Sequence, residues 1–230
     1  MRVFSIGGAT CAGKGTFLDY AQAQLGNRVY LVQIGKIMRT RHPPEFFDGK
    51  GAMQSTEAEV WEIFAEELTK GLADPNVRLI LLDGLPRMGG QIPKLLSYFN
   101  SFVQYGFVFL HASQETRKKR VISRFPYPGE ENPPRPPMPG ETDKVKNNRD
   151  LSDRRVTNDL IQIHDVLAEV TMAGFPINFV STEGPPESYC RHLLEQLWGS
   201  RITPLSSDPV ISGLDQSILD LVSKSWQPSK

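Results

Sequence analysis

Short apolar segments alternate along the chain with longer segments in which apolar residues recur every three or four positions. The short segments predict buried strands, and the longer ones predict helices with one apolar face. The predicted strands are 3–6, 28–34, 77–82, 102–110 and 177–180. The predicted helices are 16–25, one capped by Thr56, 91–99, 115–124, 154–170 and 185–198. This alternation is typical of an α/β fold with three layers, in which helices cover both faces of a central five-stranded parallel sheet.

A proline-rich segment at 125–143 interrupts the alternation. Seven of the chain's 18 prolines lie within it. Proline lacks a backbone N–H and has a fixed φ, so these residues exclude a regular helix or a central strand. A structureless stretch of this length inside a compact domain is unusual, and it is typically functional or mobile.

The segment that follows the first predicted strand has the spacing of a phosphate-binding loop, a glycine and a Gly-Lys pair separated by four residues. Glycines let successive N–H groups converge on an anion, and the start of a helix adds its own N–H groups and dipole. Lys14 can contact the β- and γ-phosphates, and Thr16 can offer an oxygen to Mg²⁺. The alternative is a glycine-rich turn that binds nothing, but the order strand, loop, helix favours phosphate binding. The loop residues assigned to binding are Gly8, Cys11, Ala12, Gly13, Lys14, Gly15 and Thr16.

Polar residues follow the second and third predicted strands. Because the carboxyl ends of parallel strands meet at one edge of a sheet, these residues are expected beside the loop. Asp83 can hold Mg²⁺ there, directly or through water, although the alternative is an aspartate that caps a turn. Arg87 and Arg39 are candidate clamps for a phosphate group, and Gln91 can hydrogen bond to the edge of a base.

Arginines after the fourth strand form a second group. Arg117, Arg120 and Arg124 lie near one face of a predicted helix, which without the phosphate loop would indicate a solvent-exposed basic face. Beside a nucleoside triphosphate, Arg120 and Arg124 can neutralise the oxygens of a phosphoryl group in transfer. The same role is open to three arginines beyond the proline-rich segment, Arg149, Arg154 and Arg155.

Composition limits the partners of the chain. Lys plus Arg and Asp plus Glu both number 26, so no general affinity for nucleic acid or for acidic membranes is expected. The two cysteines, Cys11 and Cys190, suit a reducing compartment, and Cys190 is expected in the core. No apolar run reaches the length of a membrane helix, and the N-terminus has no signal pattern, so a cytoplasmic protein without a membrane partner is expected.

Three sequence blocks together resemble the adenylate kinase family of nucleoside monophosphate kinases, over about residues 2–198. The loop ends in Gly-Lys-Gly-Thr, as in that family. The block from Asp83 to Arg87, with Gln91, is similar to the family's Asp-Gly-Phe-Pro-Arg block and the base-reading glutamine after it. The block Gly35–Arg39 is similar to the one whose arginine grips the monophosphate, and Arg120 with Arg124 is similar to the arginine pair at the edge of the lid.

The resemblance implies a kinase domain at 1–198, of the P-loop NTPase type. Its CORE would carry a helical monophosphate-binding insertion at about 35–70 and a proline-rich lid at about 125–148 that closes over the substrates, and 199–230 would be a C-terminal extension. The implied reaction is reversible transfer of the γ-phosphoryl group of Mg-ATP to a nucleoside monophosphate, with AMP as the first candidate. A monomer is expected, with small-molecule nucleotides as its partners. The lid lacks the cysteine cluster of zinc-bearing members, so no structural zinc is expected.

The resemblance also assigns residues to roles. The catalytic set is Lys14, Arg87, Arg120, Arg124, Arg149, Arg154 and Arg155. The ATP-binding set is the loop residues named above together with Arg120. The monophosphate-binding set is Ile34, Gly35, Arg39, Gly84, Arg87 and Gln91, and Thr16 and Asp83 are the Mg²⁺ residues.

The chain departs from the family in its phosphate loop, where Thr10 and Cys11 stand in place of proline and glycine. Ile34 replaces a hydroxyl residue that often contacts adenine, and Lys36 replaces an acidic one. Two alternatives therefore stay open. One is a kinase for a pyrimidine or deoxy nucleoside monophosphate, and the other is a regulatory nucleotide-binding protein with little turnover.

Overall fold

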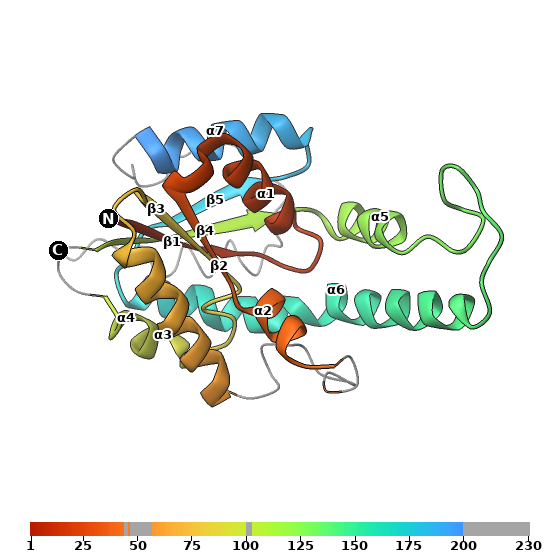
Figure 1. Ribbon diagram of the computed structural model, residues 1–230, viewed down its shortest axis with the longest axis horizontal. Coiled ribbons are helices and arrows are strands. Elements are labelled where there is room, and N and C mark those ends of the chain that lie inside the picture. The colour runs from red at the N-terminus through yellow and green to blue at the C-terminus, as the bar shows by residue number, and fades with distance from the viewer. Residues whose placement is uncertain (44–45, 47–56, 100–102, 200–230) are drawn as a thin grey trace.

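A computed structural model describes residues 1–43, 46, 57–99 and 103–199, with backbone alone at 151, 153 and 155–162. Five parallel strands form one sheet in the order β2-β3-β1-β4-β5 (Figure 1). The strands are β1 Arg2–Gly7, β2 Val29–Gln33, β3 Leu79–Asp83, β4 Gln104–His111 and β5 Ile177–Ser181. The predicted α/β class and the five-stranded parallel sheet are confirmed.

The sheet is buried on both faces because its strands are apolar at successive positions. In the central strand β1, Val3 packs with one hydrophobic cluster and the next residue, Phe4, packs with another. Helices α1 (Lys14–Leu25) and α7 (Pro186–Gly199) cover the face reached by Phe4 (Figure 1). The opposite face is covered by α3 (Glu57–Ala73), α4 (Gln91–Leu96) and the C-terminal half of α6 (Glu141–Met172).

Cys190 lies on the inner side of α7 and is fully buried, as predicted for a core residue. Burial raises the pKa of its thiol.

Helix α2 (Ile34–Arg41) packs against α3, and these two helices form the described part of the predicted monophosphate-binding insertion. Helix α2 begins at Ile34, where the sequence predicts that the second strand continues. The Thr56 cap of α3 lies outside the described residues, as does residue 200 onward, so the predicted extension is untested.

Helices α5 (Gln114–Arg124) and α6 form an antiparallel arm that projects from the sheet, with the proline-rich segment at its tip (Figure 1). The prediction that the helix after the proline-rich segment starts at 154 is wrong, because α6 begins at Glu141. Residues 141–148 of the predicted lid are therefore helical. Gly140 precedes the helix with a φ of 74°, and Glu141 and Asp143 in the first turn interact favourably with the helix dipole.

Glu141 also fastens the proline-rich segment to the helix. Its carboxylate pairs with Arg135 and accepts a hydrogen bond from the Met138 N–H at 3.0 Å. The bond from the Arg135 side chain, followed by the one from Met138, lowers the pKa of Glu141 to about 2.

Among the described residues, no helix combines the length and apolar character needed to cross a bilayer.

Candidate functional site

The glycine-rich loop between β1 and α1 has the backbone conformation that its glycines predict. Gly8 and Gly13 have φ values of 136° and 95°, which L-residues rarely adopt. A Cβ at Gly8 would collide with the Leu110 carbonyl, and one at Gly13 would lie 2.8 Å from the Tyr189 hydroxyl. Cys11 has a φ of 62°, and it is the one non-glycine residue with a positive φ in the described part of the chain. The cysteine therefore occupies a backbone conformation that glycine adopts much more readily than other residues do.

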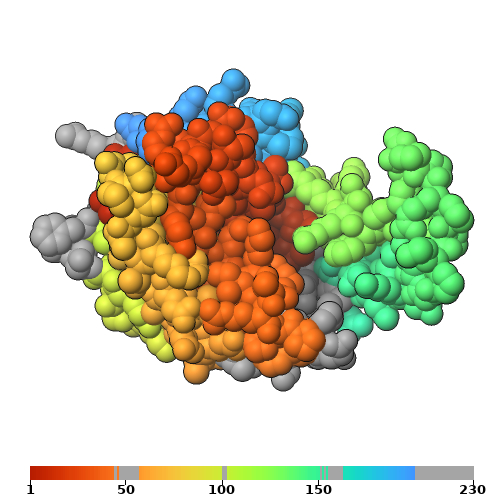
Figure 2. Space-filling model, in the orientation of Figure 1, coloured from red at the N-terminus to blue at the C-terminus, as the bar shows by residue number. Residues whose placement is uncertain are grey.

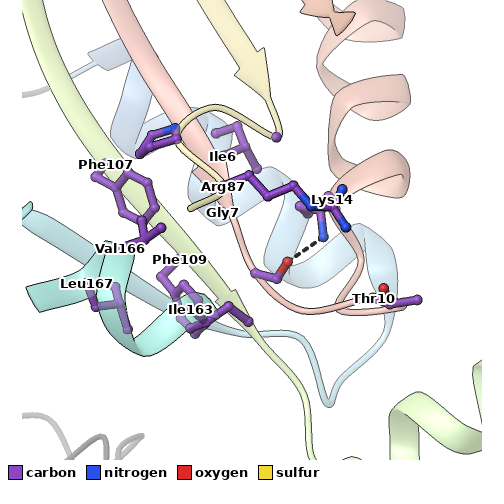
Figure 3. Close-up of a pocket in the computed structure, with 13 residues that line it drawn as sticks. Ile6, Gly7, Thr10, Lys14, Arg87, Phe107, Phe109, Ile163, Val166 and Leu167 are labelled. Carbon is purple, nitrogen blue, oxygen red and sulfur yellow. Dashed lines mark hydrogen bonds between the residues drawn. The ribbon is translucent and has the colours of Figure 1, made fainter. Parts of the chain in front are cut away.

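Lys14 opens α1 and turns its side chain back over the loop. Its Nζ donates to the Gly8 carbonyl (Figure 3). It also donates to the Ala9 carbonyl at 2.9 Å. The ammonium group is thus held where the loop would receive a phosphate.

Asp83, at the carboxyl end of β3, lies among cations from the start of α1, from α2 and from the turn that follows β3 itself. Burial raises the pKa of its carboxyl, and the charges of Lys14, Arg87 and Arg39 oppose that shift. Arg87 extends toward Lys14 across the cleft (Figure 3). The structure therefore brings together four of the residues that the sequence assigns to the site.

Two residues assigned to the monophosphate lie in the interior. Gln91 is 3% exposed, and its Oε1 accepts hydrogen bonds from the backbone N–H of Arg87 at 2.7 Å and of Met88 at 3.2 Å. Gln91 thus braces the turn that presents Arg87. Ile34 is fully buried in the hydrophobic cluster beneath α2. Its contact with a ligand stays a prediction, and the side chain would become accessible only if α2 moved.

Two glycines of the monophosphate-binding set shape its edges. Gly84 has a φ of 80°, which turns the chain after Asp83. A Cβ at Gly35 would lie 3.5 Å from the Arg39 guanidinium, within ordinary contact distance.

Arg120 reaches from α5 to the phosphate loop. Its guanidinium donates to the Cys11 carbonyl at 3.1 Å, to Thr182 Oγ1 at 3.2 Å, and to the Thr182 carbonyl. Thr182 was missed by the sequence interpretation because a lone threonine after a strand has no spacing that marks it.

The remaining predicted arginines lie on the arm. Arg124 is exposed, with its guanidinium 5.5 Å from the centre of the Phe125 ring. Arg149 lies 4.2 Å from the centre of the Tyr127 ring and 3.4 Å from the Glu130 carboxylate, so its charge faces the proline-rich segment. Arg154 is exposed, and Arg155 is described by its backbone alone. The described contacts of Arg124 and Arg149 lie within the arm, and the roles assigned to all four arginines stay predictions.

A cleft of about 550 Å³, open to solvent, connects the phosphate loop to Arg87. Figure 2 shows the surface hollowed between the arm and the body that carries α1 and α2. The floor of the cleft is apolar, and it includes Phe107, Phe109, Ile163, Val166 and Leu167 (Figure 3). The sequence predicts the helix that carries Ile163 and Leu167, but it does not place these two residues beside the site.

The residues predicted to hold Mg²⁺ supply hard oxygen donors, as that ion requires. Thr16 is exposed on the first turn of α1, and Tyr189 lies behind it with a hydrogen bond to the Thr16 hydroxyl. Burial raises the pKa of Tyr189 to about 12, so this phenol stays protonated. The raised pKa of Asp83 shows that its carboxylate is incompletely compensated by the nearby cations, which suits a cation partner. No cluster of three or more His, Cys, Asp or Glu side chains that could hold a metal occurs in the part of the chain that the structure describes.

No protein-family model matches the chain, and no curated protein matches it. Solved structures with a similar course include shikimate kinase from Aquifex aeolicus, at 20% identity and a TM-score of 0.39 over 84% of this chain and 94% of that one. A gluconokinase from Sinorhizobium meliloti matches at 16% identity and a TM-score of 0.47, over 85% of this chain and 91% of that one. Both TM-scores are below 0.5, so the fold assignment depends on the strand order and register given above.

Proposed function

We propose that this chain is a phosphotransferase that moves the γ-phosphoryl group of Mg-ATP to a nucleoside monophosphate, with AMP as the first acceptor. The observation that carries the proposal is the convergence of charged residues from three segments: Lys14, Arg39, and the pair Asp83 and Arg87. Lys14 and Arg87 line the same cleft. Phosphoryl transfer needs little covalent chemistry from the protein; it needs reactants held in line and negative charge neutralised.

Each residue has a role that its place supports. The N–H groups of the loop bind the donor phosphates, and Lys14 exchanges its two carbonyl partners for phosphate oxygens. Arg87 and Arg39 clamp the acceptor phosphate, and the attacking oxygen is already anionic, so no general base is needed. Thr16 and Asp83 are the residues that would hold Mg²⁺, which neutralises charge on the phosphates.

The choice of acceptor has a weaker basis. The resemblance to adenylate kinases favours AMP, whereas Gln91 is buried and uses its oxygen to brace the Arg87 turn. A pyrimidine or deoxy nucleoside monophosphate is therefore the second candidate. The third is a nucleotide-binding protein with little turnover, in which Arg120 and Lys14 stay bound to the loop.

A coupled assay of ADP formation with purified protein, Mg-ATP and a panel of acceptors tests the proposal. The panel holds the ribose and deoxyribose monophosphates, together with shikimate and gluconate, the acceptors named for the two structural neighbours. We expect turnover that depends on AMP, and in the reverse direction we expect AMP and ATP from two ADP, a product pair that contaminating ATPase cannot form. ATP binding without transfer to any acceptor would contradict both kinase hypotheses and support a regulatory protein.

A further inference from the structure

Thr182, the residue after β5, lies at a junction that neither the sequence nor the proposed chemistry identifies. It is fully buried. Its backbone N–H donates to the His111 carbonyl at the end of β4, at 2.8 Å. Its hydroxyl oxygen lies 3.0 Å from the Ala12 carbonyl and 3.1 Å from the His111 carbonyl. One side chain thus joins the ends of two strands to the phosphate loop.

The same hydroxyl is bound from the other side by Arg120. A threonine hydroxyl has one hydrogen to donate and two lone pairs that accept. The Arg120 guanidinium donates to a lone pair of the hydroxyl at 3.2 Å, so the hydroxyl hydrogen stays available for a carbonyl, either that of Ala12 or that of His111. The guanidinium also donates to the Cys11 carbonyl, so Arg120 and Thr182 bond to adjacent carbonyls in the same turn of the loop.

Glu183, the next residue, fixes the helix that carries Arg120. Its carboxylate accepts a hydrogen bond from the Ser113 N–H, at the start of α5, and another from the Thr116 hydroxyl at 2.6 Å. The root of the arm and the loop are therefore both fastened to the end of β5, and the distance between Arg120 and the loop is set there.

We propose that Thr182 is a positioning residue of the donor site: its hydroxyl fixes the turn at residues 11–12 and orients the Arg120 guanidinium over it. The role of Arg120 in phosphoryl transfer rests on the proposed function. The predicted effect of Thr182 on nucleotide binding does not depend on that function. The competing explanation is that the hydroxyl only satisfies a buried strand end, in which case its loss lowers stability and leaves binding unchanged.

Thr182→Val and Thr182→Ser separate these explanations, because valine keeps the shape of threonine without the hydroxyl and serine keeps the hydroxyl. Thr171→Val is the matched control, since the Thr171 hydroxyl is partly buried and bonds to the Leu167 carbonyl on α6. In the full-length protein, we measure the Kd for Mg-ATP by calorimetry, then kcat, both KM values and Tm. Should Thr182→Val give no cooperative melt, Thr182→Ala, which is smaller, replaces it.

We expect Thr182→Val to weaken Mg-ATP binding about tenfold and to lower kcat by a similar factor, as for loss of a hydrogen bond to a charged group, with the KM for the acceptor within about twofold. Thr182→Ser should restore both values to within about threefold of wild type. The double variant with Arg120→Ala should lower kcat no further than Arg120→Ala alone, because residues that act together are not additive.

Two results would overturn the inference. One is a Thr182→Val protein that melts at a lower temperature yet binds Mg-ATP as wild type does. The other is an equal loss of binding in the serine and valine variants, which would assign the effect to the methyl group. If the wild-type chain binds Mg-ATP but transfers to no acceptor, the proposed function fails while the binding comparison still decides the role of Thr182.

Discussion

Asp83 is held in a place that disfavours its charge. Burial raises the pKa of its carboxyl, and Lys14, Arg87 and Arg39 only partly oppose the shift. A carboxyl with a higher pKa in the folded than in the unfolded state binds a proton more tightly in the fold. The fold therefore loses stability as the pH rises through the window between the two pKa values, and it regains stability as the pH falls. A carboxylate kept at such a cost is typical of a functional site.

Asp83→Asn should raise the Tm of the ligand-free protein at neutral pH, because the amide carries no charge to be desolvated. The gain should shrink as the pH falls toward about 4, the ordinary pKa of an aspartate, because the wild-type side chain is by then protonated in the fold and partly protonated in the unfolded chain. Thermal unfolding from pH 4 to 8 in the absence of Mg²⁺ measures the effect. Turnover with Mg-ATP should fall by about 10²–10³-fold. A variant less stable than wild type at neutral pH would show that the carboxylate stabilises its three cations.

Arg87→Ala should lower kcat/KM for the acceptor by about 10²–10³-fold, or about 3–4 kcal/mol of transition-state stabilisation, because it removes a charge-assisted clamp. Steady-state kinetics with varied acceptor measures it. Arg78→Ala is the matched control, since the Arg78 side chain bonds to the Pro75 carbonyl before β3, at the opposite edge of the sheet. Equal kinetics for the two variants would remove Arg87 from the site.

The charged residues of the site could be predicted because short motifs carry them. Lys14 lies in the motif after the first predicted strand, and Asp83 and Arg87 lie in the block after the third, so the apolar pattern gives their approximate positions. The interior placement of Gln91 and Ile34 could not be predicted in this way, because the direction of a side chain depends on packing against segments distant in sequence. Thr182 lacked any local signal for the same reason.

At the scale of elements, the turn that carries Arg87 is fastened to α6. Glu169 on α6 accepts a hydrogen bond from the Gly90 N–H, and a Cβ at Gly89 would lie 3.1 Å from the same carboxylate oxygen. Gly89 therefore makes room for the carboxylate, and Gly90 supplies the N–H that binds it. Its other oxygen, Oε2, is buried and has no hydrogen-bond partner within the described ranges.

Glu169→Ala should destabilise the protein by about 1–3 kcal/mol, because it removes a charge-assisted hydrogen bond, and it should raise the KM for the acceptor by loosening the Arg87 turn. Glu169→Gln, which keeps a carbonyl oxygen, should have the smaller effect. Denaturant unfolding and steady-state kinetics measure the two quantities. Glu62→Ala, an exposed change on α3, is the control. A loss of stability with the acceptor KM unchanged would limit Glu169 to a structural role.

The elements of the body were predictable and those of the arm were not. Buried strands appear as continuous apolar runs, and the helices that cover them appear as amphipathic segments, so their order and type follow from the pattern. The first half of α6 projects from the body, so no apolar face marks it (Figure 1). A helix of this kind has no 3.6-residue periodicity to identify it, which is why the sequence places its start at 154 instead of Glu141.

At the scale of the whole molecule, the cleft lies between the phosphate loop, the turn that carries Arg87 and the part of α6 that is seated on the sheet, and the arm projects beyond it (Figure 1). A ligand that fills both the donor and acceptor sites would contact both sides. We expect two adenosines joined by five phosphates to draw the arm inward and to reduce the radius of gyration in small-angle X-ray scattering. Lys14→Ala, which weakens phosphate binding, should show no compaction. An unchanged radius at saturating ligand in the wild-type protein would exclude closure of the arm.

The parallel character of the sheet follows from general rules of chain connection. Right-handed crossovers and strands that are apolar on both faces predict a parallel sheet, as observed, and the candidate site lies at the carboxyl ends of its strands. The position of the arm and the apolar floor of the cleft depend on how α6 packs against the sheet. The rules of chain connection do not predict this packing.

The unbroken helix α6 has a mechanical consequence. Its C-terminal part, from Ile163 onward, is seated on the sheet, while the stretch from Glu141 to Gln162 spans about 32 Å at the helical rise of about 1.5 Å per residue. A rigid rod of that length amplifies motion, so a tilt of about 10° at its seat carries the tip through about 5–6 Å. Glu169 links that seat to the Arg87 turn. A small shift of the turn on binding an acceptor phosphate would therefore tilt α6 and displace the proline-rich tip by several times as much.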